Sequence, residues 1–294
     1  MDFGLVLPTM PRGATAEGIQ AGAEAADRLG WSTVGVTDHL IVPRTEPEDE
    51  YAHIFEALTT LAYIAGRHPR LRLGTSAICV PLRNAVQTAK EIASLDALTG
   101  GRLVVAVGLG DAEDMGEFES LGVAERFHRR GAYLNEAIRL WRHLWSGSQE
   151  PFEGQFHQVR DFSFSPLPAQ GERLPIWTGG RSPAAYRRAG QLADGYHSSR
   201  YGPKDIAEAL PLIRGEADKA GRPMLAVSVR VRVRFDGPAR KAHTLAGPPA
   251  DMLADLHAFR DLGVQHVALV LDETLPERVA SICERFQDEV IAAL

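Results

Sequence analysis

A glycine-rich segment between an apolar run and a helical pattern is the first candidate for chemistry. Residues Pro175–Ser182 read Pro-Ile-Trp-Thr-Gly-Gly-Arg-Ser. Gly179 and Gly180 would let the backbone approach an anion closely, and the N–H groups at the start of a helix favour negative charge. Arg181 could add a bidentate partner, and Ser182 could cap the helix. The segment indicates either a phosphate site or a plain strand-to-helix turn, because it carries no Walker lysine and no complete dinucleotide fingerprint.

Asp38 and His39 are the second candidate, because they follow the apolar run Thr33–Thr37 directly. A histidine at the end of a barrel strand can act as an acid, a base or a donor to developing charge. The alternative is a buried structural histidine that hydrogen-bonds Asp38. His197, at the end of a later apolar run, has the same two interpretations.

Small residues mark two further strand ends. Residues Gly74–Pro81 read Gly-Thr-Ser-Ala-Ile-Cys-Val-Pro, and Gly108–Asp111 read Gly-Leu-Gly-Asp. Small side chains would let a flat ring approach the backbone, although an ordinary strand exit explains the first segment as well. Asp111 offers a carboxylate, unless it belongs with Glu113 and Asp114 to a solvated acidic loop.

Two common chemistries lack their sequence patterns. The ten histidines show no His-x-His and no His-Glu-x-x-His spacing, so we expect no metal site. The nucleophile-elbow pattern Gly-x-Ser-x-Gly is also absent, which disfavours a serine hydrolase.

Alternating strand-like and helix-like segments must position these residues. Strands are expected at Phe3–Leu7, Thr33–Thr37, Leu71–Val80, Leu103–Gly108, Leu174–Thr178, Gly195–Ser198, Leu225–Val233 and His266–Leu271. Helices are expected at Thr15–Leu29, Glu50–Ala65, Asn84–Leu98, Arg129–Trp145, Pro183–Leu192, Lys204–Ala220, Ala250–Leu262 and Pro276–Ala292. Eight alternations predict an α/β fold, one (β/α)₈ barrel over residues 1–294. A doubly wound sheet is the alternative, because the pattern alone does not force closure.

Two insertions exceed ordinary connections. Asp111–His128 follows the fourth strand, leaves the carboxyl end of the barrel and is therefore a candidate substrate loop. Ser146–Arg173 follows the fourth helix and contains a short hairpin pattern at Phe152–Phe156.

Composition is that of an ordinary globular protein, with 45% hydrophobic and 24% charged residues. The net charge of −6 argues against a nucleic-acid partner, although Arg230, Arg232 and Arg234 would share one face of a strand. Two cysteines imply no disulfide framework and fit a cytoplasmic location. We expect no signal peptide and no membrane span.

The ordered motifs of this chain resemble the bacterial luciferase-like monooxygenase superfamily, in its deazaflavin-dependent branch. The resemblance covers nearly the whole chain and rests on the order and spacing of several motifs. These are Phe3–Pro8, EAADRLGWSTVGVTDH from Glu24, Leu71–Thr75 with Pro81–Asn84, ASLDALTGGR from Ala93, Gly108–Gly110, EFESLG from Glu117, Phe152–Gly154, and Pro175–Ser182 with Ala193–Gly195.

The resemblance implies a barrel that binds coenzyme F420, a 5-deazaflavin, at the strand ends, with flavin mononucleotide (FMN) as the alternative. Gly179–Ser182 would hold the cofactor phosphate, and Ser76, Ala77 and Gly108 would face its ring. The Asp38–His39 pair would lie beside the ring. The resemblance also implies a cis peptide at Ser76–Ala77 and lends weight to Asp111, although many relatives have Trp at that position.

Three functions are compatible with this resemblance. The first is an oxidoreductase that transfers a hydride between F420 and a small organic substrate, with His39, Asp38 and Asp111 as catalytic residues. The second is an FMN-dependent monooxygenase supplied by a partner reductase, and the third is a flavin-binding carrier without catalysis. Substrate choice would lie in the loops Arg44–Tyr51, Asp111–His128 and Phe235–Gly247. A homodimer is expected, through Glu50–Ala65 and Asn84–Leu98.

Overall fold

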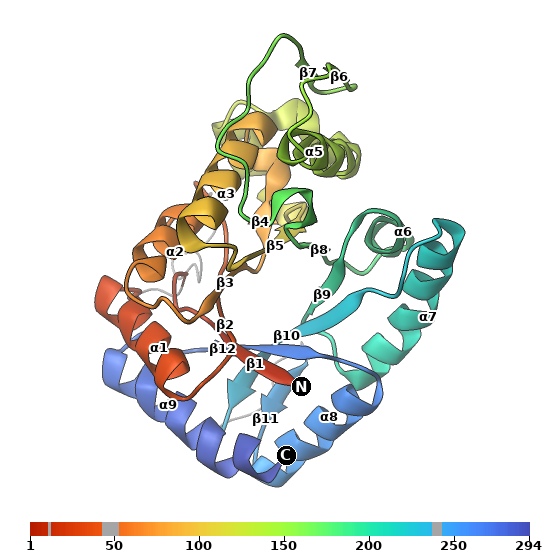
Figure 1. Ribbon diagram of the computed structural model, residues 1–294. Coiled ribbons are helices and arrows are strands. Elements are labelled where there is room, and N and C mark those ends of the chain that lie inside the picture. The colour runs from red at the N-terminus through yellow and green to blue at the C-terminus, as the bar shows by residue number, and fades with distance from the viewer. Residues whose placement is uncertain (11–12, 43–52, 237–242) are drawn as a thin grey trace.

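The computed structural model describes residues 1–10, 13–42, 53–236 and 243–294. Within these residues, eight parallel strands close a barrel (Figure 1). They are β1 (Asp2–Val6), β2 (Thr33–Val36), β3 (Arg72–Thr75), β5 (Leu103–Gly108), β8 (Ile176–Thr178), β9 (Gly195–Ser199), β10 (Ala226–Arg234) and β12 (His266–Leu271).

Each barrel strand is followed by a helix on the outside of the barrel. These helices are α1 (Ala16–Arg28), α2 (Ala57–Ala65), α3 (Ala85–Thr99), α5 (Arg130–Trp145), α6 (Pro183–Leu192), α7 (Pro203–Lys219), α8 (Pro249–Asp261) and α9 (Pro276–Glu289). The ring of helices around the strands is seen end-on in Figure 1. The predicted (β/α)₈ barrel is confirmed.

Closure of the sheet excludes the doubly wound alternative. The first strand pairs in parallel with both β2 and the last strand, β12, in a register that places Asp2 beside His266. The strand β10 likewise pairs with both β12 and β9. No strand of this ring is therefore left with an open edge, and the side chains that point inward share one enclosed core.

Local sequence explains where the helices begin and end. The side chain of Asn84 caps α3 by accepting the N–H groups of Val86 and Gln87, as predicted. Gly100 then ends this helix in the left-handed region, at φ +69°. Outside the barrel, Trp141 and Trp145 of α5 are buried and donate their indole N–H groups to backbone oxygens of α3, which fixes α5 against α3.

The second helix is shorter than predicted. The pattern indicated Glu50–Ala65, but within the described residues the helix begins at Ala57. Glu56 is its N-cap, because its carboxylate accepts the N–H of Thr59 at 2.6 Å. The preceding residue, Phe55, lies outside the helix and donates its N–H to the carbonyl oxygen of Thr9 after β1 at 3.1 Å. Residues 50–52 of the prediction lie outside the described residues.

The third strand is interrupted, whereas a continuous strand Leu71–Val80 was predicted. The strand β3 ends at Thr75, and β4 (Ile78–Cys79) continues the pairing with β5. Residues Ser76 and Ala77 form a break between them. After β4 the chain turns into the short 3₁₀ helix η1 (Val80–Leu82), which contains Pro81. The break places two residues of the predicted ring site outside the regular ladder.

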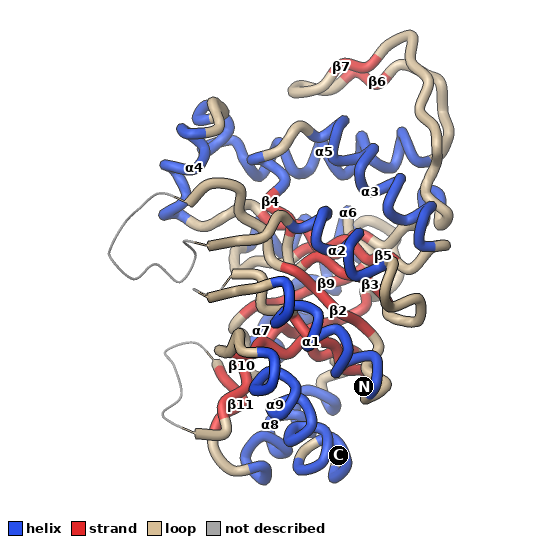
Figure 2. Tube along the Cα trace, turned by 90° about the vertical axis from the view of Figure 1, so that its left-hand side faces the viewer, coloured by secondary structure: helices blue, strands red, loops and turns tan. Residues whose placement is uncertain are grey.

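Both insertions have structure of their own. The first, expected as a loop at Asp111–His128, contains η2 (Ala112–Asp114), α4 (Met115–Ser120) and most of η3 (Ala124–Arg129). The second contains the predicted hairpin, formed by β6 (Phe152–Glu153) and β7 (Gln158–Val159). Figure 2 shows α4 at one end of the barrel and the hairpin beyond α5, outside the ring of helices. The turn of the hairpin packs on the first two turns of α5, where Gln155 and Phe156 donate their N–H groups to the carboxylate of Glu136.

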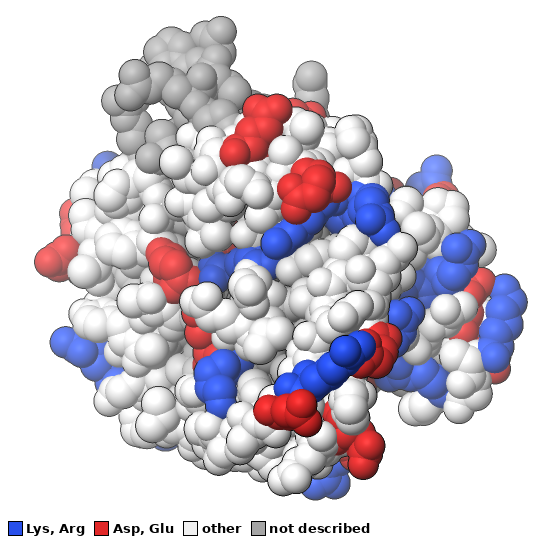
Figure 3. All heavy atoms as spheres, turned by 90° about the horizontal axis from the view of Figure 1, so that it is seen from above, with Lys and Arg blue, Asp and Glu red and all other residues white. Residues whose placement is uncertain are grey.

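Charged side chains of both signs are interspersed on the face seen in Figure 3. No field of a single sign covers this face, in keeping with the modest net charge of the chain. In the described part of the chain, no helix is long and apolar enough to cross a membrane.

Candidate active site

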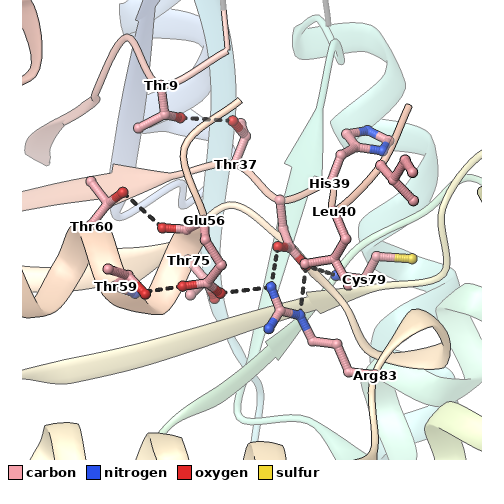
Figure 4. Close-up of polar contacts among 12 residues, drawn as sticks. Thr9, Thr37, His39, Leu40, Glu56, Thr59, Thr60, Thr75, Cys79 and Arg83 are labelled. Atoms are coloured by element: carbon pink, nitrogen blue, oxygen red, sulfur yellow. Dashed lines mark hydrogen bonds and ion pairs between the residues drawn. The ribbon is translucent and has the colours of Figure 1, made fainter. Parts of the chain in front are cut away.

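Asp38 is a buried anchor for the loop that follows β2. Its carboxylate accepts the N–H of Cys79 at 2.9 Å and two guanidinium nitrogens of Arg83, at 2.5 and 3.1 Å. Arg83 also donates to Glu56 at 2.9 Å (Figure 4). Burial alone would lower the pKa of Arg83, but these two carboxylates raise it. The side chain of Asp38 is 0% exposed, so it positions the chain that carries His39.

His39 is held by a buried carboxylate. Its Nδ1 lies 2.8 Å from one oxygen of Glu117, and the other oxygen accepts the N–H groups of Leu40 and Ile41. Burial alone would lower the pKa of His39, but the hydrogen bond and charge of Glu117 raise it above its usual value. Burial alone would raise the pKa of Glu117, but the same hydrogen bonds lower it below its usual value. The geometry therefore favours a protonated imidazole beside an ionised carboxylate.

Asp114 is the acidic residue of the insertion that the structure brings to this pair. One ligand atom from each of His39, Asp114 and Glu117 lies within 4.8 Å of the other two. Asp111 is exposed and precedes η2, and its N–H donates to the carboxylate of Asp114 at 2.6 Å. Both oxygens of Glu117 already accept hydrogen bonds, and we assign no metal ion to this cluster.

The predicted ring site brings Ala77 and Gly108 together. The Ser76–Ala77 peptide is cis, as the resemblance implies. A Cβ built on Gly108 would lie 3.7 Å from the Cβ of Ala77. The side chain of Ser76 points into the barrel instead, where Oγ lies 2.8 Å from Nε2 of His197. Its carbonyl oxygen accepts a hydrogen bond from Arg230.

The glycine segment after β8 is a tight backbone cradle. A Cβ on Gly179 would lie only 2.4 Å from a carbonyl oxygen of β9, so no larger residue fits there. Gly180 lies at φ +109°, in the region that favours glycine. Its carbonyl oxygen accepts the hydroxyl of Tyr196 at 2.9 Å. Ser182 caps α6, as predicted, by accepting the N–H of Ala185.

Arg181 turns toward the end of β9. Its guanidinium donates to the carbonyl oxygens of Ser199 and Arg200, at 3.0 and 2.8 Å, and lies over the ring of Tyr201. In the described part of the chain, the backbone N–H groups of residues 180–182 make no hydrogen bond to a protein acceptor. These N–H groups, more than the Arg181 side chain, are therefore available to an anion.

The three arginines of β10 share one face of the strand, as predicted. Arg230 contacts Ser199 of β9 and the backbone of Ser76, so it faces across the barrel. Arg232 and Arg234 both form ion pairs with Asp272, directly after β12. Arg232 and Arg234 therefore share one carboxylate.

Comparison with known proteins identifies the class of this barrel. The fold and its polar strand ends are those of an α/β barrel with its site at the carboxyl end. The sequence profile of the luciferase-like monooxygenase family matches residues 1–268, and the chain belongs to this family.

Several known proteins are similar to this chain. An F420-dependent glucose-6-phosphate dehydrogenase of Nakamurella multipartita is 32% identical over 230 residues, which are 75% of this chain and 64% of the relative. A monooxygenase of Streptomyces bottropensis superposes with a TM-score of 0.82 at 21% identity, over 100% of this chain and 99% of that chain. An F420-dependent secondary alcohol dehydrogenase gives 0.83 at 17% identity, with the same coverage.

Sequence reasoning alone missed three residues of the site. Glu117 was noted only as the first residue of a family motif, and Arg83 only within Pro81–Asn84. Asp114 enters the sequence argument only through the alternative of a solvated acidic loop. Nothing in local spacing links these residues to Asp38 or His39, because the links depend on how the insertion folds back. Of the predicted substrate loops, Arg44–Tyr51 and residues 237–242 of Phe235–Gly247 lie outside the described residues.

Proposed function

We propose that this protein is an oxidoreductase that transfers a hydride between coenzyme F420 and a small organic substrate of the alkene, imine or carbinol type. The observation that carries the proposal is the set of backbone N–H groups of residues 180–182 at the start of α6, which make no hydrogen bond to a protein acceptor within the described residues. Family membership and the F420-dependent relatives support the choice of cofactor.

The residues present fit a phosphorylated ring cofactor. The cradle at Gly179–Ser182 offers N–H groups at the start of α6, which favour an anion. The small residues Ala77 and Gly108 leave the adjoining strand ends without bulky side chains. We propose that the cradle holds the phosphate and that Ser76, Ala77 and Gly108 form the wall beside the ring.

The cofactor and the side chains of this site would have separate roles. F420 supplies two-electron hydride chemistry, and the protein supplies orientation and proton transfer. We propose that His39 donates or accepts a proton at Nε2, since Glu117 holds Nδ1. Asp38 would act by positioning His39, because its hydrogen bond with Arg83 fixes the residue that precedes His39. Asp111, exposed at the start of the insertion, would meet the substrate.

The substrate of the first relatives need not be that of this chain. Those relatives are named for glucose 6-phosphate, and the alignment spans 64% of the first one's length. Arg232 and Arg234 could meet a phosphate, but both pair with Asp272.

An FMN-dependent monooxygenase is the second candidate, favoured by the family description and by the monooxygenase among the similar structures. Fluorescence titration of the purified protein with F420 and, separately, with FMN distinguishes the two. We expect F420 to bind with a dissociation constant of about 1 µM or below, which corresponds to roughly −8 kcal/mol. Preference for FMN, with oxygen uptake, would support the monooxygenase. Binding of F420 without turnover in a substrate screen would indicate a carrier, and binding of neither cofactor would contradict the site.

We further propose one domain over residues 1–294, a cytoplasmic location and a homodimer. The outer face of α2 and α3 has a groove that includes Leu98, whose side chain is well exposed. A second copy could cover this face. Light scattering should give the mass of a dimer, and Leu98→Asp should shift it toward the monomer. Limited proteolysis without a stable fragment would support one domain.

A further inference from the structure

A cavity lies inside the barrel, toward the end where the strands begin. Its volume is about 190 Å³, and apolar atoms form most of its lining. Asp2, Arg72 and Gln265, at or just before the first residues of three strands, are exposed and line its outer part. Ser76 and His197 are buried and line its inner part. The cavity therefore reaches from the amino end of the barrel into its interior.

Two glycines on neighbouring strands keep this space open. Gly35 of β2 is paired with Gly74 of β3, and both line the cavity. An added Cβ would make only ordinary contacts, the nearest at 3.7 Å for Gly35 and at 3.5 Å for Gly74. Neither residue has a positive φ. The backbone therefore permits a larger side chain at both positions.

Glycine is an unfavourable residue at such positions. Within a strand it weakens the sheet, because it loses much conformational freedom on folding and has no side chain to pack. Interior positions of a (β/α)₈ barrel are usually filled by bulky branched residues. Strand glycines that no backbone strain requires are typical of places where a ligand approaches the sheet closely. Gly35 and Gly74 therefore indicate a space that a bound molecule fills.

His266 contributes a polar atom without a protein partner to this cavity. Its Nδ1 lies 2.8 Å from Oγ of Ser228, which fixes the ring. Its Nε2 is buried and has no hydrogen-bond partner among the described residues. This nitrogen faces Gly4, another lining residue, because a Cβ added to Gly4 would lie 2.9 Å from it. Since a buried polar atom without a partner is costly, a molecule that hydrogen-bonds Nε2 would be stabilised there.

Aromatic rings form one wall of the cavity. The ring of Trp177 lies 6.0 Å from that of His197, tilted by 35°, and 6.0 Å from that of His266, at an angle of 60°. All three residues line the cavity. Aromatic rings favour a further ring in offset-stacked or edge-to-face contact. This wall therefore suits a flat aromatic ligand.

The inner part of the cavity carries no charge at neutral pH. Burial lowers the pKa of His197 to about 3 and that of His266 to about 4, so both imidazoles are neutral near pH 7. The charged side chains of the lining, Asp2 and Arg72, belong to its exposed part. A neutral imidazole nitrogen either donates or accepts a hydrogen bond, and a hydroxyl group can do both. A neutral ligand with a hydroxyl group therefore matches Nε2 in either tautomer.

We propose that this cavity binds a small neutral aromatic molecule that carries one hydroxyl group, of the size of phenol. The hydroxyl group would hydrogen-bond Nε2 of His266, and the ring would lie against Gly35 and Gly74 beside Trp177. A cavity of about 150 Å³ accepts benzene, so the larger volume here admits a ring with one substituent. The ligand would enter from the amino end of the barrel, opposite the end proposed for F420. This second site goes beyond the proposed function and does not depend on it.

The first test is titration of the protein, labelled with ¹⁵N-histidine and without F420, with phenol. We expect a saturable shift of the ring-nitrogen signals of His266, which are assigned by their loss in His266→Gln. The dissociation constant should be about 1 mM or below. Absence of saturation, as for a cavity that holds only water, would overturn the proposal. A saturable shift at His39 without one at His266 would also overturn it, because phenol would then occupy the carboxyl-end site.

A comparison of two probes tests the hydrogen bond in the wild-type chain. Toluene has nearly the size of phenol but no hydroxyl group, so Nε2 of His266 stays without a partner when toluene binds. We expect toluene to bind about five times more weakly than phenol, or weaker still. Equal affinity for the two probes would overturn the assigned role of His266 and with it the proposed ligand class.

The last test fills the cavity. Gly35→Val should weaken phenol binding about tenfold or more, because its side chain occupies the space beside Gly74. Gly66→Val is the matched control, since Gly66 is exposed at the end of α2 and nothing lies within 4 Å of its Cβ position. It should bind phenol as the wild type does. Wild-type affinity in Gly35→Val would overturn the proposal. If this variant does not fold, the two probes in the wild-type chain decide the question.

Discussion

Glu117 binds Nδ1 of His39 at 2.8 Å, although the two residues are 78 positions apart in the chain. The contact joins the loop after β2 to the helix α4 in the insertion after β5. Glu117 also accepts the two N–H groups that follow His39. One buried carboxylate therefore sets the position, the ring orientation and the proton affinity of the proposed acid.

Replacement of Glu117 by Gln should lower the pKa of His39. The amide keeps the shape of the side chain but removes the charge that favours the imidazolium, and burial, which lowers the pKa, is left unopposed. Histidine titration by NMR measures the effect. Glu119→Gln, at an exposed position of the same helix, should leave the pKa unchanged, and equal titration of both variants would contradict the assignment.

The same pair predicts how stability depends on pH. The raised pKa of His39 stabilises the fold fully below pH 6.5, and this contribution is lost as pH rises through the pKa of His39 in the folded state. The lowered pKa of Glu117 stabilises the fold above 4.5, and this contribution is lost as pH falls through its folded value. The difference in unfolding free energy between wild type and Glu117→Gln should therefore be largest from about pH 4.5 to 6.5. A difference in unfolding free energy that does not change with pH would contradict the assigned His39–Glu117 ion pair.

Arg83→Met should destabilise the protein by about 3–5 kcal/mol, because it leaves Asp38 as a buried charge without its partner. Urea unfolding measures the loss. Arg70→Met is the control: Arg70 also donates two nitrogens to an aspartate, Asp27, but its side chain is 79% exposed. Removal of such a surface pair should cost less than about 1 kcal/mol. Equal losses would show that Asp38 is not a buried anchor.

Gly179→Ala should weaken F420 binding at least tenfold and destabilise the fold by about 1–3 kcal/mol, since the new Cβ must displace β9. Fluorescence titration and thermal unfolding measure the two effects. Gly215→Ala in α7 is the matched substitution, because nothing lies within 4 Å of its Cβ position. It should keep full binding and gain up to about 1 kcal/mol from helix propensity. Normal F420 binding by Gly179→Ala would show that the cradle does not bind the cofactor.

Neither cysteine should react with a disulfide reagent in the native protein at pH 8. Burial raises the pKa of Cys79 well above its usual value, with the charges of Asp38 and Glu117 adding to the effect. Burial raises that of Cys283 to about 12. A colorimetric thiol assay should detect two thiols per chain only after denaturation. Rapid labelling of one thiol in the folded protein would disprove this burial.

Much of the fold could be predicted because each strand carries its own local pattern. The strand His266–Leu271 and the helix Pro183–Leu192 match their predicted bounds, since apolar runs and caps mark both. The start of the helix predicted at Glu50–Ala65 was wrong, because local periodicity does not show that Phe55 bonds Thr9 or that Glu56 caps the helix.

The site was harder to predict, since its contacts join distant segments. Gly179 and Ser182 stand out locally, and their backbone geometry agrees with the sequence pattern. The partners of Asp38 and His39 do not stand out in the local sequence, because Arg83 and Glu117 contact them only in the folded barrel. His197, Ser228 and His266 likewise become neighbours only through the register of β9, β10 and β12, which no local motif encodes.

The pairing of β1 with β12 sets the order in which this chain can fold. Residues 2 and 266 become neighbours only when nearly the whole chain has folded. Closing so long a loop costs conformational entropy before the contacts between β1 and β12 form. Until the last strand arrives, β1 and β10 each present an unpaired ladder to solvent. Refolding should therefore be slow, with partly assembled sheets prone to self-association at high protein concentration.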